Sequence, residues 1–127
     1  QNDSISMKLI ADDYLEYMET IFTYFENLSD DFLKYKPNHI LLLHANELNA
    51  DYLDELLEIL KKRDYSFISI DEALTDPAYQ LPEAVSNRGI SWIVRWRMAE
   101  GLAITEQPKA SEMIMLKMKY YKTMSSN

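Results

Sequence analysis

Apolar residues recur every three or four positions along the first quarter of the chain, over residues 7–35. This spacing predicts one long amphipathic helix, because residues three or four apart share a helical face. Pro37 is expected to stop the helix shortly beyond its last turn. The apolar stripe consists of Ile10, Tyr14, Met18, Ile21, Phe25, Leu28 and Phe32. We expect it to pack on the rest of the domain; a partner-binding or coiled-coil helix is the alternative.

An unbroken apolar run follows and predicts a strand over residues 39–44, buried on both faces. A second strand is expected over residues 66–70, and a helix rich in buried leucines lies between the two. Asn49 is the expected cap of that helix, and Asp64 is expected to adopt a left-handed backbone just after it. Strand, helix and strand in this order predict parallel strands joined by a right-handed crossover, so the expected fold class is α/β.

The remaining segments are expected to be mostly helical. A short helix is predicted over residues 71–74, and Trp92 and Trp96 share a face if residues 90–98 are helical. Residues 110–124 predict a final helix within a tail, residues 102–127, of uncertain role. Two parallel strands alone leave both sheet edges unpaired. Residues 1–127 are therefore expected to form a single incomplete domain, whose other strands come from an N-terminal segment or another subunit.

The composition excludes several classes of function but says little about the fold. The formal net charge of −8 argues against a nucleic-acid partner, because phosphate binding needs a basic patch. The chain has no cysteine, which excludes disulfides and thiolate metal sites, and two glycines, too few for a glycine-rich phosphate loop. No apolar run reaches the ~18 residues of a membrane span, so no membrane partner is expected.

The two histidines of the chain are His39 and His44. Five positions apart on a strand, they would point to opposite faces and could not readily bind one ion. A complete zinc site within this chain is therefore not expected. His44 at the end of its strand is the candidate general acid or base, since an imidazole titrates near neutrality. A structural or merely exposed histidine is the alternative.

Three stretches together resemble the C-terminal third of the polysaccharide deacetylases, the nodulation-type carbohydrate esterases. The stretches are Ile40-Leu41-Leu42-Leu43-His44-Ala45-Asn46, Phe67-Ile68-Ser69-Ile70-Asp71-Glu72-Ala73-Leu74 and Asp76-Pro77-Ala78-Tyr79. The resemblance covers roughly residues 8–100 in order and spacing. It implies the C-terminal part of a distorted (β/α) barrel that removes acetyl groups from N- or O-acetylated glycans. It also suggests an extracytoplasmic or secreted location.

The resemblance further implies roles for particular residues. His44 would be the general acid, and Leu42 would line the pocket for the acetyl methyl group. The complete enzyme would use a divalent metal, commonly zinc, with a carboxylate base. From its aromatic character, Trp92 is a candidate for stacking on a sugar ring of the acetylated glycan, and helix packing is the alternative.

The chain also departs from the family pattern. It contains no Thr-Phe-Asp-Asp-Gly motif for the base and no His-x-x-x-His metal pair. Asp12 and Asp13 lie inside the predicted first helix and take no metal role. We therefore expect no metal bound by this chain alone, and activity only with an N-terminal part that supplies the missing motifs. The alternative is a non-catalytic α/β interaction module that completes its sheet with another chain.

Overall fold

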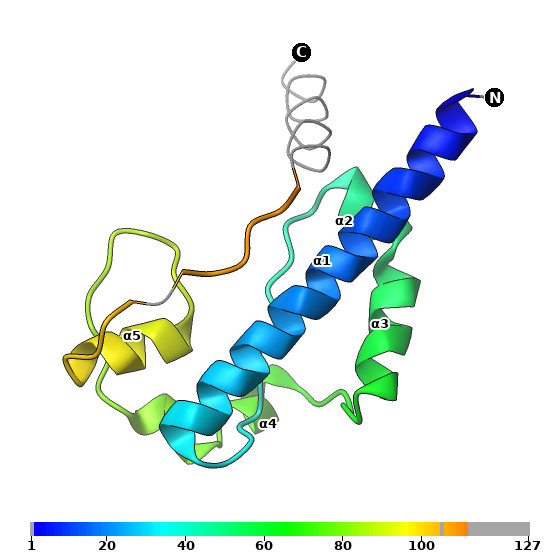
Figure 1. The fold of residues 1–127 in the computed structure, drawn as a ribbon. Helices are drawn as coiled ribbons and strands as arrows, with labels where there is room; N and C mark the ends of the chain where they lie inside the picture. Colours follow the sequence, from blue (N-terminus) through cyan, green and yellow to red (C-terminus); the bar gives the residue numbers. More distant parts are fainter. Residues whose placement is uncertain (1, 105, 112–127) are drawn as a thin grey trace. The chain divides into compact units, whose positions relative to one another are not determined.

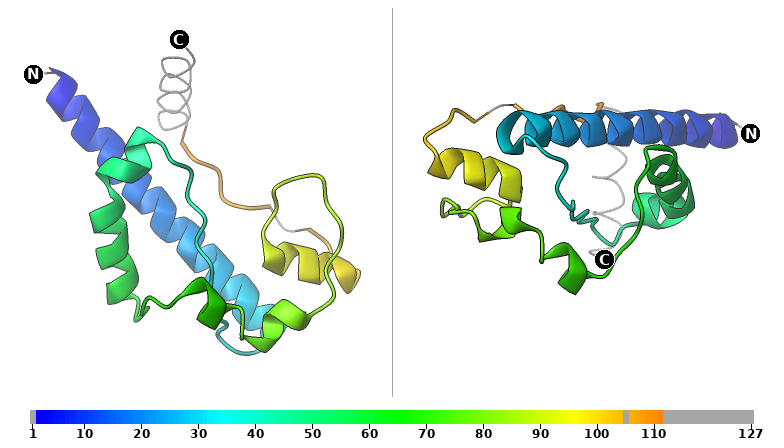
Figure 2. Two further views of the ribbon diagram at one scale, coloured as in Figure 1. Left: turned by 180° about the vertical axis from the view of Figure 1, so that it is seen from behind. Right: turned by 90° about the horizontal axis from the view of Figure 1, so that it is seen from below.

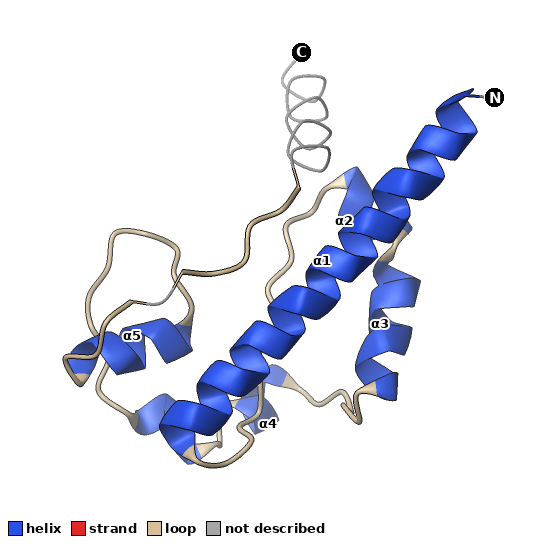
Figure 3. Cartoon of the chain, in the orientation of Figure 1, coloured by secondary structure: helices blue, strands red, loops and turns tan. Residues whose placement is uncertain are grey.

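The structure is a computed structural model that describes residues 2–104 and 106–111. Over these residues the chain forms helices joined by loops (Figures 1 and 3). The elements are α1 (Asn2–Leu33), α2 (Glu47–Asp51), α3 (Leu53–Lys62), α4 (Ile70–Ala73), the 3₁₀ helix η1 (Pro77–Gln80) and α5 (Trp92–Ala99).

The expected α/β fold class is wrong. The described part of the chain contains no strand, so it is not a barrel fragment with two parallel strands in a strand-helix-strand unit. Residues 39–44 and 66–69 are loops, and residue 70 already belongs to α4. An apolar run reports a preference for burial, but a strand also needs a neighbouring strand to pair its backbone groups. No described residue supplies that ladder to either segment.

The first helix confirms the helical pattern of the sequence. Figure 2 shows α1 as one continuous helix in both views. Five of the seven stripe residues are buried, and Phe25 and Phe32 are half-buried. The helix ends at Leu33, earlier than the sequence pattern indicated, because Lys34 adopts a left-handed backbone with φ of 64°. Pro37 lies beyond this turn and is not what stops the helix.

The chain divides into two compact units. Unit 1 comprises Gln1–Ile21, Leu42–Ser66 and Pro108–Asn127, and unit 2 comprises Phe22–Leu41 and Phe67–Gln107. Helix α1 therefore contributes its first two thirds to unit 1 and its last third to unit 2. The predicted final helix over residues 110–124 lies almost wholly outside the described residues, and residues 102–104 and 106–111 are not helical.

Unit 1 is built on α1, α2 and α3. Its buried side chains include Leu48 of α2 and the completely buried Leu56 of α3. The helical stretch starts earlier than expected, because Asn46 and not Asn49 is the N-cap of α2. Asp64 adopts the predicted left-handed backbone after α3, with φ of 66°.

Unit 2 has a core of Leu28, Ala78, Ile93 and Trp96, contributed by α1, η1 and α5. Helix α4 begins after Ser69, whose hydroxyl accepts a hydrogen bond from the backbone N–H of Glu72. The sequence pattern placed this start two residues later, at Asp71. Helix α5 confirms that Trp92 and Trp96 lie on a helix, and both indoles contact Tyr79 edge to face, at ring-centroid distances of 5.3 and 5.4 Å.

Candidate functional site

The candidate site is the loop of unit 1 that leads into α2 and carries His44. The side chain of His44 is exposed, and the residue lies three positions before the first residue of α2. Its backbone carbonyl oxygen accepts two hydrogen bonds, from the Asn46 backbone N–H at 2.9 Å and from Asn49 Nδ2 at 2.9 Å. The backbone of His44 is thus fixed while its imidazole remains open to a ligand.

The fixed loop depends on the local chemistry of the helix start. Asn46 Oδ1 accepts a hydrogen bond from the Asn49 backbone N–H at 2.8 Å, which caps α2. The side chain of Asn49 makes a second contact: its Oδ1 accepts a hydrogen bond from the hydroxyl of Tyr14 in α1. A chain of contacts therefore runs from α1 through Asn49 to the carbonyl of His44.

Tyr14 is the buried end of this chain of contacts. Its side chain is 4% exposed, and its ring lies against that of Tyr52 at a centroid distance of 6.2 Å. Burial raises the pKa of Tyr14 to about 12, so the hydroxyl stays protonated near neutral pH and can donate to Asn49. From the sequence, Tyr14 was expected in the apolar stripe and Asn49 was expected to cap a helix. The hydrogen bond between their side chains was not predicted.

Leu42 lies two residues before His44 on the same loop. It is 85% exposed, so within the described residues it forms no closed pocket for a methyl group. An exposed leucine next to an exposed histidine still offers an apolar contact beside a proton donor. Two of the three predicted site residues, Leu42 and His44, thus lie exposed on the same loop of unit 1.

Trp92, the third predicted site residue, lies at the start of α5 in unit 2. Its indole is 40% exposed and packs partly on Tyr79, whereas Trp96 is 3% exposed and belongs to the core. Trp92 thus packs against Tyr79 and remains partly exposed, whereas Trp96 is a packing residue. Burial also raises the pKa of Tyr79 to about 12, with the charge of Asp76 adding to the shift.

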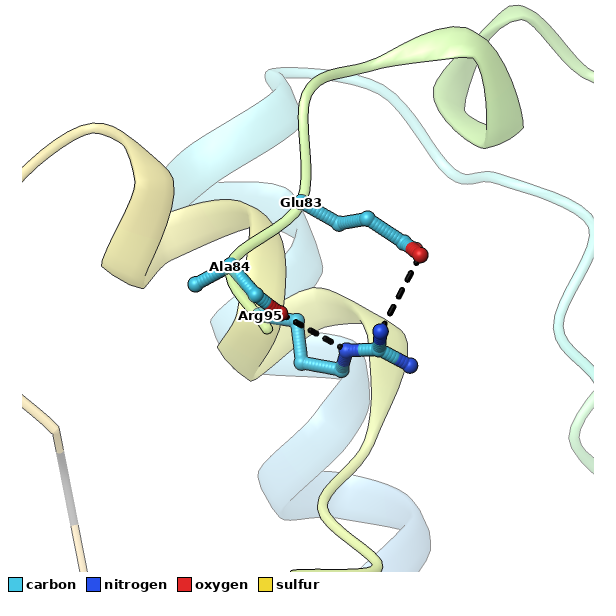
Figure 4. A network of polar contacts seen from close by, with 3 residues as sticks. All are labelled: Glu83, Ala84 and Arg95. Atoms are coloured by element: carbon cyan, nitrogen blue, oxygen red, sulfur yellow. Dashed lines mark hydrogen bonds and ion pairs between the residues drawn. The ribbon is translucent and has the colours of Figure 1, made fainter. Parts of the chain in front are cut away.

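The loop before Trp92 is fastened to α5 by Arg95 (Figure 4). Arg95 Nε donates to the Ala84 carbonyl oxygen at 3.1 Å, and the Ala84 N–H donates to the Arg95 carbonyl oxygen at 3.1 Å. The Arg95 guanidinium also forms an ion pair with Glu83 at 3.0 Å. Val85, the next residue on this loop, is 90% exposed.

The residues described here do not fit the divalent metal that the family resemblance implies. Within residues 2–104 and 106–111, no three carboxylate or imidazole side chains come together as metal ligands. Asp13 accepts a hydrogen bond from the hydroxyl of Ser111. We therefore derive no step of a reaction through a metal held by these residues.

Comparison with known proteins gives no relative: no family model, no curated protein and no solved structure matches the chain. Among the helices described, none combines the length and the apolar character needed to span a membrane. The function of the chain is therefore inferred from the residues of the candidate site.

Proposed function

We propose that this chain provides the proton-donating side of a polysaccharide deacetylase, with His44 as the general acid. In this reaction water adds to the acetyl carbonyl, the bond from the carbonyl carbon to the sugar nitrogen or oxygen breaks, and acetate leaves. The departing amine or alkoxide must take up a proton, and the His44 imidazolium supplies it. The proposal rests on the resemblance of residues 40–46, 67–74 and 76–79 to the family pattern.

One structural observation carries the proposal: the backbone of His44 is held by two hydrogen bonds while its imidazole is exposed. A general acid must be both fixed in position and accessible to the substrate, because misplacement by a fraction of an ångström slows proton transfer. A histidine kept only for packing would be buried, and a histidine on an unanchored loop would be poorly placed for catalysis.

The neighbouring residues are assigned to glycan binding. Leu42, exposed beside His44, would contact the acetyl methyl group once substrate covers it. Trp92 is 40% exposed, and sugar rings stack on the faces of exposed aromatic side chains. On this proposal the metal and the carboxylate base come from polypeptide other than the described residues, and the divalent metal would be zinc.

The test is acetate release by the product of the native reading frame. The substrates are chitin oligosaccharides for N-acetyl groups and acetylated xylan for O-acetyl groups. Replacing His44 with Ala should lower kcat by about 10²–10⁴-fold, the usual contribution of a general acid. His39→Ala is the matched control, since it removes the other histidine of the chain. An unchanged kcat in His44→Ala, with folding intact, would refute the role of His44.

A second candidate function is a binding module that recruits another polypeptide. Its supporting observation is the exposure of two adjacent apolar residues on one loop of unit 2, Phe67 and Ile68, which are 54% and 42% exposed. Neighbouring exposed apolar side chains are typical of interaction sites. The absence of acetate release by the complete gene product, together with partner binding that survives His44→Ala, would favour this function.

A further inference from the structure

We infer that Tyr14 and Asn49 are positioning residues for His44: the buried hydroxyl of Tyr14 orients the Asn49 amide, and the amide fixes the His44 carbonyl. The role in catalysis rests on the proposed function, whereas the positioning itself concerns the geometry of this chain alone. All three residues belong to unit 1.

The first step is the orientation of the Asn49 amide. An asparagine side chain has one accepting oxygen and one donating NH₂ group, and turning it over exchanges them. In the structure Oδ1 faces the Tyr14 hydroxyl and Nδ2 faces the His44 carbonyl at 2.9 Å. The reversed orientation would place two oxygen atoms against each other at His44. The contact to the His44 carbonyl therefore requires the orientation that a hydroxyl donor at Tyr14 favours.

The second step is the rigidity of the donor. Tyr14 lies in the middle of the first long helix, is 4% exposed and packs on Tyr52. Its hydrogen bond to Asn49 is partly buried, so a Tyr14 hydroxyl that lost this acceptor would be costly to leave unpaired. The raised pKa of Tyr14, about 12, keeps the proton on the oxygen at all physiological pH values.

The third step is the transfer of this rigidity to His44. The His44 carbonyl accepts from the Asn46 N–H and the Asn49 amide, one contact local and the other leading to α1. The local contact joins residues two positions apart and cannot by itself fix the loop against the helix. The contact through Asn49 is the one that ties the histidine backbone to the buried core.

The experiment uses the full chain, labelled for NMR spectroscopy, in three variants. Tyr14→Phe removes the hydroxyl and keeps the ring, and Asn49→Asp keeps an acceptor for Tyr14 but removes the donor to His44. Tyr17→Phe is the matched control. Tyr17 lies in the same helix, and its hydroxyl makes no hydrogen bond with any described residue. The signals followed are the His44 carbonyl carbon and the Asn46 amide.

Both Tyr14→Phe and Asn49→Asp should shift the His44 carbonyl resonance and speed hydrogen exchange of the Asn46 amide about tenfold, because the loop opens more often. Tyr17→Phe should leave both signals unchanged. In the active gene product, Tyr14→Phe should lower kcat about tenfold with an unchanged KM, since positioning affects the reaction step more than substrate binding.

The inference is overturned if Tyr14→Phe lowers thermal stability but leaves the His44 and Asn46 signals as in the wild type. It is also overturned if Asn49→Asp leaves the His44 and Asn46 signals unchanged. The hydrogen bond from the Asn49 amide would then not hold the His44 carbonyl in place. A gene product that releases no acetate refutes the proposed function and leaves the NMR outcome to decide the positioning separately.

Discussion

Asp76 joins two segments of unit 2, the loop after α1 and the start of η1, through one buried carboxylate. It is 8% exposed and accepts hydrogen bonds from the Tyr35 hydroxyl, from the Asn38 N–H at 2.7 Å and from the Ala78 N–H at 2.9 Å. The last of these caps η1, and the first two hold the loop after α1. Tyr79 reinforces this loop by donating from its hydroxyl to the Asn38 carbonyl at 2.7 Å.

Replacing Asp76 with Ala should therefore lower the free energy of unfolding by about 2–4 kcal/mol, since it removes a cap and leaves two backbone N–H groups without their acceptor. Urea unfolding followed by circular dichroism measures the change. Asp71→Ala, at an exposed position in the first turn of α4, is the control and should cost less than about 0.5 kcal/mol. Equal effects of the two substitutions would contradict the assigned role.

The same carboxylate predicts sensitivity to acid. Burial raises the pKa of Asp76, but the hydrogen bonds from Tyr35, Ala78 and Asn38 outweigh it and hold the pKa below its ordinary value. A carboxyl with a lowered pKa in the folded state stabilises the fold above its unfolded pKa of about 3.9, and this contribution is lost as the pH falls through the folded pKa. Unfolding free energies measured from pH 5 down to pH 2 should decline less steeply in Asp76→Asn than in the wild type.

Two tyrosines should respond at the opposite end of the pH scale. The pKa values of Tyr14 and Tyr79 are raised to about 12 by burial, against an ordinary value of 10.0. Between these values the unfolded chain loses the proton and the folded chain keeps it, so stability falls as the pH rises from 10 to 12. An absorbance titration at alkaline pH should show two tyrosines ionising near pH 12, later than an ordinary tyrosine. Tyr14→Phe should remove one of the late ionisations, and its persistence would contradict the assignment.

At the scale of elements, the sequence predicted the first helix and α5 correctly, whereas its two predicted strands were wrong. The apolar stripe from Ile10 to Phe32 is enough to predict a helix, because a helix forms its hydrogen bonds within one segment and needs only one apolar face. Residues 39–44 carry an equally clear apolar signal, but a strand depends on a partner that the pattern of one segment does not contain. The same limit applies to the candidate site: His44 was proposed from its sequence motif and stays a prediction, whereas the contact of Tyr14 with Asn49 joins residues 35 positions apart and has no local sequence signal.

The loop that precedes α5 illustrates how one side chain can hold an element. Arg95→Ala should free this loop, because it removes both the contact to the Ala84 carbonyl and the ion pair with Glu83. The Ala84 amide should then exchange its hydrogen faster, while the Glu83→Gln variant should change the exchange rate little, since a partly exposed ion pair contributes less than about 1 kcal/mol. Hydrogen exchange followed by NMR measures both variants. Similar exchange rates in Arg95→Ala and the wild type would show that the backbone contact alone holds the loop.

At the scale of the whole molecule, apolar exposure and net charge act against each other. Leu42, Phe67 and Ile68 are exposed on loops, and apolar side chains in contact with water favour association. A net charge of −8 at pH 7 opposes association between copies, because like-charged molecules repel. The repulsion vanishes near the isoelectric point of about 4.7. The balance should therefore change with pH in a direction that can be stated in advance.

We expect the average particle mass from light scattering to rise as the pH is lowered from 7 to 5 at low salt. The double variant Leu42→Ser with Phe67→Ser should weaken this rise, since it removes apolar surface without changing the charge. Val85→Ser is the control for loss of an exposed apolar side chain elsewhere. An equal rise in the wild type and the double variant would mean that the two loops do not drive association. A rise reduced only in the double variant would show that exposed apolar residues of these two loops contribute to association between copies.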